Sequence, residues 1–490
     1  MRFLLLIICI LFAGCQRPGD DAIRFGLASA PVNLDPRYAT DATSERINRL
    51  LYARLTDHDE QSRPIPSLAS WTRINPTQYR FTLGAGDREF HDGRHLDAED
   101  VAATYRSILD PSGTSPHRAA LSMIARIEVL DADTLDFHLN RPDTLFPGYL
   151  SIGILPAQAI DRQQAFSRTP VGSGLFRLLS WEQANRLTLE RRSDAQRVVF
   201  EQVSDPTMRV LKLLRGEIDL LQNDLPPELL AYLADRSGIH VQRRPGSSFA
   251  YLGFQLEDPH CSRDTVRRAV ALAIDREAII QHVFGGTARP ASALLPPEHW
   301  AGAPGLPQIA PDPKRARQLL AGAGYTPDSP LVLTYKTSSD PFRLRIATVL
   351  QQQLGDVGID VRIRSYDWGT FYGDIKAGRF QLYSLAWVGI KSPDIFRYAF
   401  HSDSLPPAGA NRGRFSDAAV DRLIEQAQQA GTLDAQAGIY RELQQRLLQQ
   451  LPYVPLWYED QYVAAGERID GYTLAADGAY DALVSTMRIQ

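Results

Sequence analysis

The stretch from Tyr79 to Tyr105, YRFTLGAGDREFHDGRHLDAEDVAATY, contains the pattern of a strand, a turn and the start of a helix. Tyr79, Phe81 and Leu83 alternate with polar residues, as in a strand with one buried face. The run FHDG at 90–93 holds an Asp and a Gly, which suit a tight turn. The stretch therefore predicts a strand and a turn that lead into a helix.

The helix is expected to begin after Asp97, with Asp100 three residues further on completing a capping box. The stretch has an aromatic strand, then F-H-D-G, then L-x-A-x-D-V. This order resembles the signature of the peptide/nickel class of ABC-transporter solute-binding proteins. A purely structural interpretation fits as well, because His91, Asp92 and Asp100 suit turn and cap positions. The resemblance places the stretch in an extra subdomain, so we expect it to identify the family without contacting ligand.

Further motifs along the chain match the same family. They are Leu34-Asp35-Pro36, VGSGLFRL at 171–178, LLRGEIDL at 213–220 and DPKRARQLLAGAGY at 312–325. Strand-like and helix-like segments alternate between them, which points to an α/β protein. The resemblance therefore covers nearly all of the chain after its first residues.

The chain is long enough for several domains. At 490 residues it exceeds what one hydrophobic core usually supports, so two or three domains are expected. The resemblance implies an α/β, two-lobe fold of the periplasmic-binding-protein type (class II), with an extra subdomain in the first lobe. Lobe I is expected to comprise residues 22–46, 172–254 and 461–490, the extra subdomain residues 47–171, and lobe II residues 255–460.

The first residues predict a targeting segment. The apolar run from Phe3 to Phe12 is too short to span a bilayer. It leads into Phe12-Ala13-Gly14-Cys15, which resembles the lipobox of bacterial lipoproteins. The resemblance implies a signal peptide over 1–14, lipidation of Cys15, a tether over 15–21 and a membrane anchor on the periplasmic side of the envelope. The alternative is an ordinary signal peptide with a chance cysteine.

Charge and motif content narrow the function. A net charge of −4 argues against nucleic acid as a main partner. The sequence has no H-E-x-x-H, G-x-S-x-G or P-loop motif, so no catalytic residue is predicted and the protein is expected not to be an enzyme. His91 and His95 flank a turn, and His401 is expected on a solvated loop near the cleft. Neither a metal site nor a cofactor is predicted.

A ligand site is expected between the lobes, where small ligands usually bind. The resemblance implies contacts from the loop before Leu34, the turn at 172–174, the strand near Tyr251 and the loop after Trp387. Two arginines in NRGRFSD at 411–417 are candidates for a ligand carboxylate or phosphate, with a solvated or interdomain salt bridge as the alternative. The predicted ligand-binding residues are Asn33, Ser173, Gly174, Tyr251, Gln255, Trp387, Gly389, Asp394, Arg412 and Arg414.

The loop after Trp387 departs from the family pattern. Peptide-binding relatives typically carry W-x-G-D-x-x-D-P there, and the first Asp holds the ligand amine. This chain has Ile390 at that position, Lys391 beside it, and Asp394 in place of the second, more structural acid. Two interpretations follow. Either Asp394 or an acid elsewhere holds the amine, or the ligand is not an ordinary peptide and carries an anionic group near Lys391.

The sequence thus predicts a lipid-anchored solute-binding protein of an ABC importer. It would capture a peptide or peptide-like solute between the lobes and deliver it to a permease and ATPase complex. The alternatives are a binder of a metal chelate, an opine or another non-peptide anionic solute, an envelope hydrolase, and a ligand-sensing lipoprotein without a permease.

Overall fold

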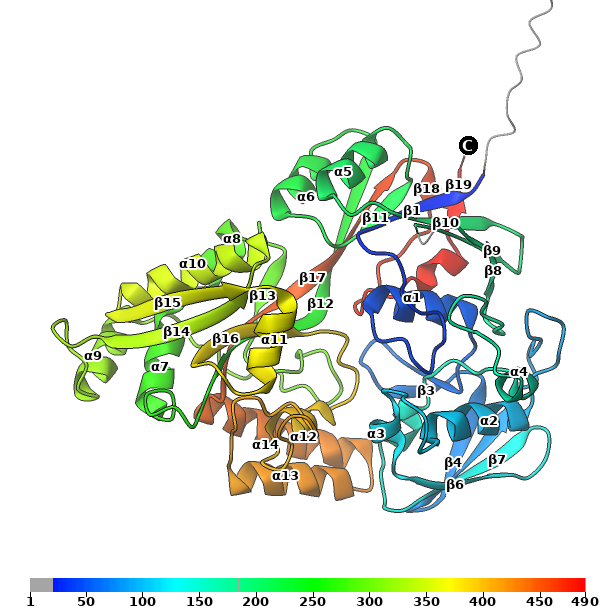
Figure 1. The fold of residues 1–490 in the computed structure, drawn as a ribbon, viewed down its shortest axis with the longest axis horizontal. Helices are drawn as coiled ribbons and strands as arrows, with labels where there is room; N and C mark the ends of the chain where they lie inside the picture. Colours follow the sequence, from blue (N-terminus) through cyan, green and yellow to red (C-terminus); the bar gives the residue numbers. More distant parts are fainter. Residues whose placement is uncertain (1–20, 183–184, 490) are drawn as a thin grey trace, which may run out of the picture.

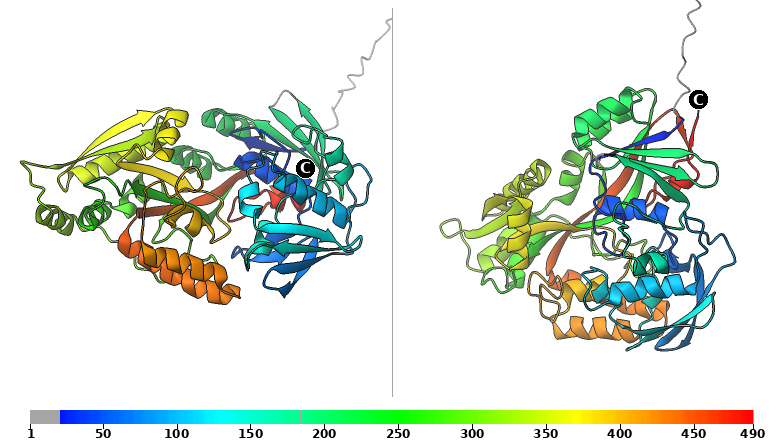
Figure 2. Two further views of the ribbon diagram at one scale, coloured as in Figure 1. Left: turned by 60° about the horizontal axis from the view of Figure 1, so that its bottom comes forward. Right: turned by 45° about the vertical axis from the view of Figure 1, so that its right-hand side comes forward.

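The computed structural model describes residues 21–182 and 185–489, which form two lobes on the right and left of Figure 1. Strands and helices alternate along most of the chain. Lobe I holds both ends of the described chain, and lobe II is built from its second half (Figure 2). No helix of the described residues is long and apolar enough to cross a membrane. The predicted signal peptide, Cys15 and most of the tether lie outside the described residues.

Lobe I is organised around β1 (Ile23–Leu27), which pairs in parallel with β10 (Arg197–Gln202) and β11 (Leu220–Gln222). Its core packs the buried side chains of this sheet against α1 (Ala42–Leu51), whose first turn is capped by Asp41. The other elements of this lobe are α4 (Ala157–Asp161), β8 (Phe176–Glu182), β9 (Arg186–Arg191), α5 (Pro206–Leu214), α6 (Pro227–Ala234), β18 (Ile469–Asp470), η2 (Asp481–Val484) and β19 (Met487–Arg488).

The extra subdomain of lobe I has its own sheet, in the order β4-β5-β7-β6, and its own apolar core. β5 (Gln78–Leu83) and α2 (Ala98–Leu109) confirm the predicted strand and helix, and Asp97 with Asp100 forms the predicted capping box. His91 lies against lobe I, where its Nε2 is 3.1 Å from the carbonyl oxygen of Gly174. The remaining elements are β2 (Thr56–His58), β3 (Pro64–Pro66), β4 (Ala69–Asn75), α3 (Arg118–Leu121), β6 (Ile124–Val129), β7 (Thr134–Leu139) and η1 (Phe146–Tyr149).

Lobe II contains the parallel pair β14 (Leu331–Ser338) and β15 (Ile359–Tyr366), beside β16 (Leu382–Trp387). One apolar cluster packs helices on these strands, and a second packs the last helices on the far side of β16. The helices and the short strand of this lobe are α7 (Asp264–Ala273), α8 (Arg276–His282), β13 (Ala288–Pro290), α9 (Pro313–Gly322), α10 (Pro341–Gly355), α11 (Trp368–Lys376), α12 (Ile395–Phe400), α13 (Ala418–Gln429) and α14 (Leu433–Gln450).

Two long antiparallel strands, β12 (Ile239–Phe254) and β17 (Tyr453–Gly466), run from one lobe into the other (Figures 1 and 2). They join the lobes in one mixed sheet, in the order β15-β14-β16-β12-β17-β11-β1-β10-β9-β8. The register of the pair is interrupted between Arg244 and Ser248. We call residues 244–248, with the facing residues 459–461, the crossing segment. A second shift in register lies between Ala250 and Tyr251, but the longer interruption is at the crossing segment, where we expect this pair to bend.

The pairing also bears on the expected domain boundaries. Residues 249–254 pair with β16 and pack in the lobe II cores, so we propose that lobe II begins at the crossing segment rather than at residue 255. The buried core of the extra subdomain runs from Leu55 to Ile154, whereas α1 packs into the main core of lobe I. We therefore propose a subdomain narrower than residues 47–171.

Candidate functional site

Among the described residues, two neighbouring hollows lie between the lobes, with volumes of about 290 and 380 Å³. We call the first the α1 hollow, because α1 forms one wall, and the second the crossing hollow, because it reaches the crossing segment. Arg49, His58 and Lys391 line both. The α1 hollow is completed by Pro36, Arg54 and residues from the segments 117–121, 148–153 and 389–392. The crossing hollow is completed by Arg289, Ile390 and residues from the segments 59–62, 244–247, 296–299 and 475–481.

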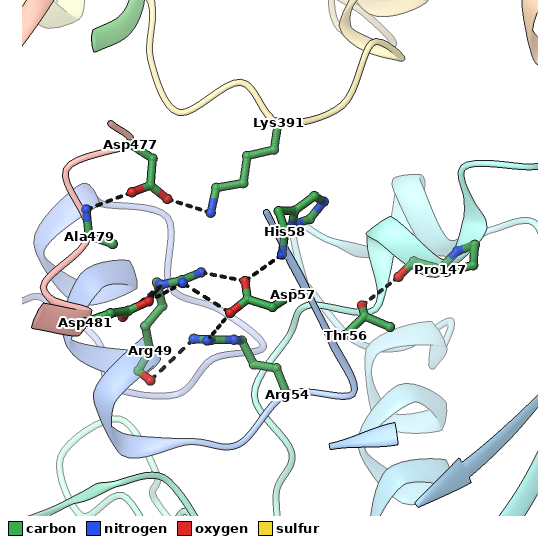
Figure 3. Close-up of polar contacts among 10 residues, drawn as sticks. All are labelled: Arg49, Arg54, Thr56, Asp57, His58, Pro147, Lys391, Asp477, Ala479 and Asp481. Atoms are coloured by element: carbon green, nitrogen blue, oxygen red, sulfur yellow. Dashed lines mark hydrogen bonds and ion pairs between the residues drawn. The ribbon is translucent and has the colours of Figure 1, made fainter. Parts of the chain in front are cut away.

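A network of ion pairs lies where the hollows meet (Figure 3). Arg49 reaches Asp57 at 3.2 Å and also pairs with Asp481. Arg54 donates to Asp57 at 2.7 Å. Burial alone would raise the pKa of Asp57, but Arg54 and Arg49 lower it to about 2. The carboxylate therefore stays ionised at neutral pH, and the network is fixed within lobe I.

Lys391 extends this network across the gap between the lobes. Its Nζ lies 2.8 Å from a carboxylate oxygen of Asp477 in the C-terminal tail (Figure 3). Burial opposes the charge of Asp477, but Lys391 and Arg49 bring its pKa well below the usual range. The carbonyl oxygen of Lys391 lies 3.0 Å from Nε2 of His299, which fixes the loop on the lobe II side. An ion pair thus connects the loop after β16 to lobe I.

The histidines of the hollows are neutral at pH 7. Burial lowers the pKa of His58 to about 4, with nearby Lys391 acting in the same direction, and burial also lowers the pKa of His299 to about 4. The described residues contain no group of three or more His, Cys, Asp or Glu side chains that could hold a metal ion. The walls of the hollows carry hydrogen-bonding and charged side chains.

Of the predicted ligand-binding residues, the structure places Gly389 in the wall of the α1 hollow. Tyr251, Trp387 and Arg412 form a separate aromatic group inside lobe II. Arg412 donates to the hydroxyl of Tyr251 at 2.9 Å and stacks over the ring of Trp387 at 4.8 Å. These three residues lie together, but none of them lines either hollow.

Gln255 and Arg414 form another group on lobe II. Gln255 donates to the carbonyl oxygen of Gly378 at 3.0 Å, and Arg414 pairs with Glu257 at 3.3 Å. Asp394 accepts from Gln428 at 3.0 Å beside the start of α12, and burial raises its pKa.

The lobe I predictions lie in tight packing around α1. The backbone N–H of Asn33 donates to the hydroxyl of Ser44 at 3.0 Å. Gly174 donates to the carbonyl oxygen of Leu51 at 2.9 Å, and a Cβ at Gly174 would lie 2.4 Å from the backbone there. Ser173 beside it is buried, and its hydroxyl has no partner among the described residues. At this turn the glycine permits the close approach of two protein segments.

Three side-chain environments differ from the predictions. Arg412 is neither solvated nor salt-bridged: it is buried and, in the described part of the chain, contacts hydroxyls and aromatic rings instead of a carboxylate. Although burial disfavours its charge, the surrounding tyrosines raise the pKa of Arg412. Arg414 forms its salt bridge within lobe II. His401 is 3 % exposed rather than solvated, with Nε2 3.5 Å from Glu425, because α12 and α13 enclose it.

Several wall residues were not predicted from the sequence. Glu45, Asn48 and Arg49 belong to α1. Their spacing at i, i+3 and i+4 places them on one helix face, which is a signal available in the sequence. Asp477 and Asp481 come from the C-terminal tail, more than 400 residues away, and no local pattern links them to α1.

Comparison with known proteins identifies the family. The model of the bacterial extracellular solute-binding proteins, family 5 (middle region), matches residues 63–405. The chain belongs to this family. Family 5 consists of solute-binding proteins of transport systems, so the interlobe hollows of this family 5 protein are the natural candidates for its solute site.

Individual relatives cover most of the chain. A probable di/tripeptide-binding protein 5 of Pseudomonas aeruginosa is 26 % identical over 481 residues, 91 % of each chain. Heme-binding protein A of Haemophilus influenzae is also 26 % identical, over 93 % of this chain and 90 % of its own. Among solved structures, CtaP of Listeria monocytogenes gives a TM-score of 0.86 at 22 % identity, covering 96 % of this chain and 99 % of its own. These similarities confirm the two-lobe α/β fold.

Proposed function

We propose that this family 5 protein captures a peptide or peptide-like solute between its lobes and delivers it to an ABC permease with its ATPase. The proposal rests on the pair of hollows, whose walls come from both lobes. They lie next to β12 and β17, the two strands that connect the lobes in the sheet of the described residues. A solute held there contacts both lobes at once, so it stabilises the closed arrangement over an open one.

The crossing segment is the proposed hinge. β12 and β17 continue through both lobes. Their register shifts at two places, between Arg244 and Ser248 and between Ala250 and Tyr251, and the first of these is the longer and lies at the crossing hollow. Bending at this place moves the loop of Lys391 away from Asp477 without disturbing either core. The ion pair between these residues then forms only when the lobes are closed.

Two lines of support favour a peptide. Among similar proteins, several from Pseudomonas aeruginosa are named as dipeptide- or di/tripeptide-binding proteins. The hollows, at about 290 and 380 Å³, are at the lower end of ligand-pocket volumes, which suits a short peptide. An anionic solute directed at Lys391 is disfavoured, because Asp477 already neutralises that ammonium group.

A binding screen tests the proposal. The protein is incubated with mixed di- and tripeptides, with a nickel–histidine complex, with heme or with agropinic acid, and analysed by native mass spectrometry and thermal unfolding. Peptides are expected to be retained and to raise the unfolding temperature; a ligand at 100 times its Kd stabilises by about 2.7 kcal/mol. Retention of one of the other solutes without any peptide would refute the peptide assignment.

We also propose that Cys15 carries the lipid anchor on the periplasmic side of the membrane. Its support is the lipobox-like run Phe12-Ala13-Gly14-Cys15 in the sequence. Stable anchoring needs more than one acyl chain. Metabolic labelling with a fatty-acid analogue is expected to mark the wild-type protein and not Cys15→Ala. Equal labelling of both, or of neither, would contradict the anchor.

A further inference from the structure

One helix face of lobe I contributes polar residues to the wall of the α1 hollow. Glu45, Asn48 and Arg49 lie on this face of α1, opposite the loop 389–392 of lobe II. Arg49 is engaged by Asp57 and Asp481. Glu45 and Asn48 have no such partners for their side chains among the described residues, and their surroundings indicate which group of the solute binds in the hollow.

The cations around the α1 hollow are already neutralised by protein carboxylates. In the described part of the chain Arg49 and Arg54 share Asp57, Arg49 also pairs with Asp481, and Lys391 pairs with Asp477. The network thus balances three positive with three negative charges. An anionic solute has no free cation to meet in this network.

Glu45 adds a carboxyl group to this balanced network. It is exposed to the hollow and, within residues 21–182 and 185–489, takes part in no ion pair and in no side-chain hydrogen bond. Its ionised form therefore gives the α1 hollow an excess of negative charge. Gly389 and Ile390 of the facing loop carry no charge that offsets it.

Asn48 supplies an independent observation. The residue is 5 % exposed, both polar atoms of its side chain are buried, and neither Oδ1 nor Nδ2 has a hydrogen-bond partner among the described residues. A buried amide without partners is costly, so such groups are normally satisfied in the working state of a protein. Because Asn48 lines the α1 hollow one helical turn from Glu45, a polar group of the solute is the partner that the geometry provides.

We propose that Glu45 and Asn48 form the subsite that holds a cationic group of the solute, which in a peptide is the α-ammonium group. The ammonium donates to the Glu45 carboxylate and to Oδ1 of Asn48, and Nδ2 of Asn48 donates to the first peptide carbonyl. This inference rests on the proposed function and specifies the orientation of the peptide: its amino end lies against α1 in lobe I.

The surroundings of Glu45 agree with such a role. Although the Glu45 side chain reaches solvent, the protein atoms around the hollow remove part of the water from its carboxyl group. This desolvation, followed by Asp41, raises the pKa of Glu45 to about 7, while Lys391, Arg49 and Arg54 act in the opposite direction. An ammonium ion in the hollow favours the ionised carboxylate and brings the pKa down. The remaining titratable groups that line the same hollow are His58, His117 and Tyr149; burial lowers the pKa of both histidines and raises the pKa of Tyr149.

The test compares peptides that have and lack the ammonium group. A mixed di- and tripeptide library with free amino ends and the same library after N-acetylation are offered to the full-length protein, and retention is measured by native mass spectrometry. The variants are Glu45→Gln, Asn48→Ala and, as a charge-matched control, Glu467→Gln, whose side chain is exposed on lobe I. Thermal unfolding without ligand reports whether each variant is folded.

The wild type and Glu467→Gln are expected to prefer free over acetylated peptides by about 10- to 100-fold, the range of a charge-assisted hydrogen bond. Glu45→Gln is expected to lose this preference, and Asn48→Ala to weaken it. An unchanged preference in Glu45→Gln, or an equal loss of free and acetylated peptides, would overturn the subsite alone. If the wild type retains neither library, the peptide assignment itself fails and the subsite falls with it.

Discussion

The ion pair between Lys391 and Asp477 leads to the most specific prediction about closure. The pair joins the loop after β16 in lobe II to the C-terminal tail in lobe I at 2.8 Å (Figure 3). If it forms only when the lobes are closed, Lys391→Met or Asp477→Asn weakens closure. Because the solute binds between closed lobes, the affinity for the solute falls by the same factor.

The structure sets the size of this effect. Two unit charges 2.8 Å apart attract by about 6 kcal/mol at an effective dielectric constant of 20. Desolvation and the lost side-chain entropy offset most of this. The side chains are 25 % and 28 % exposed, so the pair is screened less than a surface pair and retains about 1–2 kcal/mol. The Kd for a peptide is therefore expected to rise about 5- to 30-fold.

The assay is calorimetric titration of a retained peptide into the wild type, the two single variants and the double variant. The double-mutant cycle isolates the coupling between the two residues. The control is the ion pair Arg345–Glu228, which joins α10 to α6 across the lobes at 2.5 Å. Its side chains are 49 % and 63 % exposed, so its coupling energy should be under about 1 kcal/mol. A coupling energy near zero for Lys391 and Asp477 would refute their role in closure.

Further predictions concern stability. Burial, assisted by Asp394, raises the pKa of Asp143 to about 6, so the folded protein loses stability as the pH rises from about 4 to 6 and this carboxyl ionises. Asp143→Asn should therefore raise the free energy of unfolding by about 1–3 kcal/mol at pH 7 and leave it unchanged at pH 4, as measured by urea titration. Gly246→Ala would place a Cβ 2.2 Å from a β17 carbonyl oxygen and should lower the unfolding temperature, whereas Gly322→Ala, with open space around it, should not. Arg412→Met removes the donor to Tyr251 and should cost about 1–3 kcal/mol in chemical denaturation without changing the affinity for a peptide.

Local patterns predicted the elements well, because their signals lie within a few residues. The alternation around Phe81 and the Asp97–Asp100 spacing depend on backbone periodicity and capping, and both reappear in β5 and α2. The two-lobe fold followed from motifs spread over the chain. The place where β12 passes from one lobe to the other was not predicted. A continuous strand has no local sequence pattern that shows where its neighbouring strands change.

The site was predicted less completely, for a physical reason. The loop at Gly389 and the departure at Ile390 and Lys391 are visible in the sequence, and this loop does line the hollows. The contact between Lys391 and Asp477 has no sequence signal, because it depends on how the C-terminal tail folds back beside α1. The same long-range packing decides which helix faces point inward, and so Glu45 and Asn48 emerged only from the structure.

A crystal structure of the protein with a retained di- or tripeptide would show where the solute binds. We expect electron density for one peptide between α1 and the loop 389–392, in contact with both lobes and with its amino end at Glu45. Peptide density on one lobe alone or outside both hollows would show that the solute does not bind between the lobes.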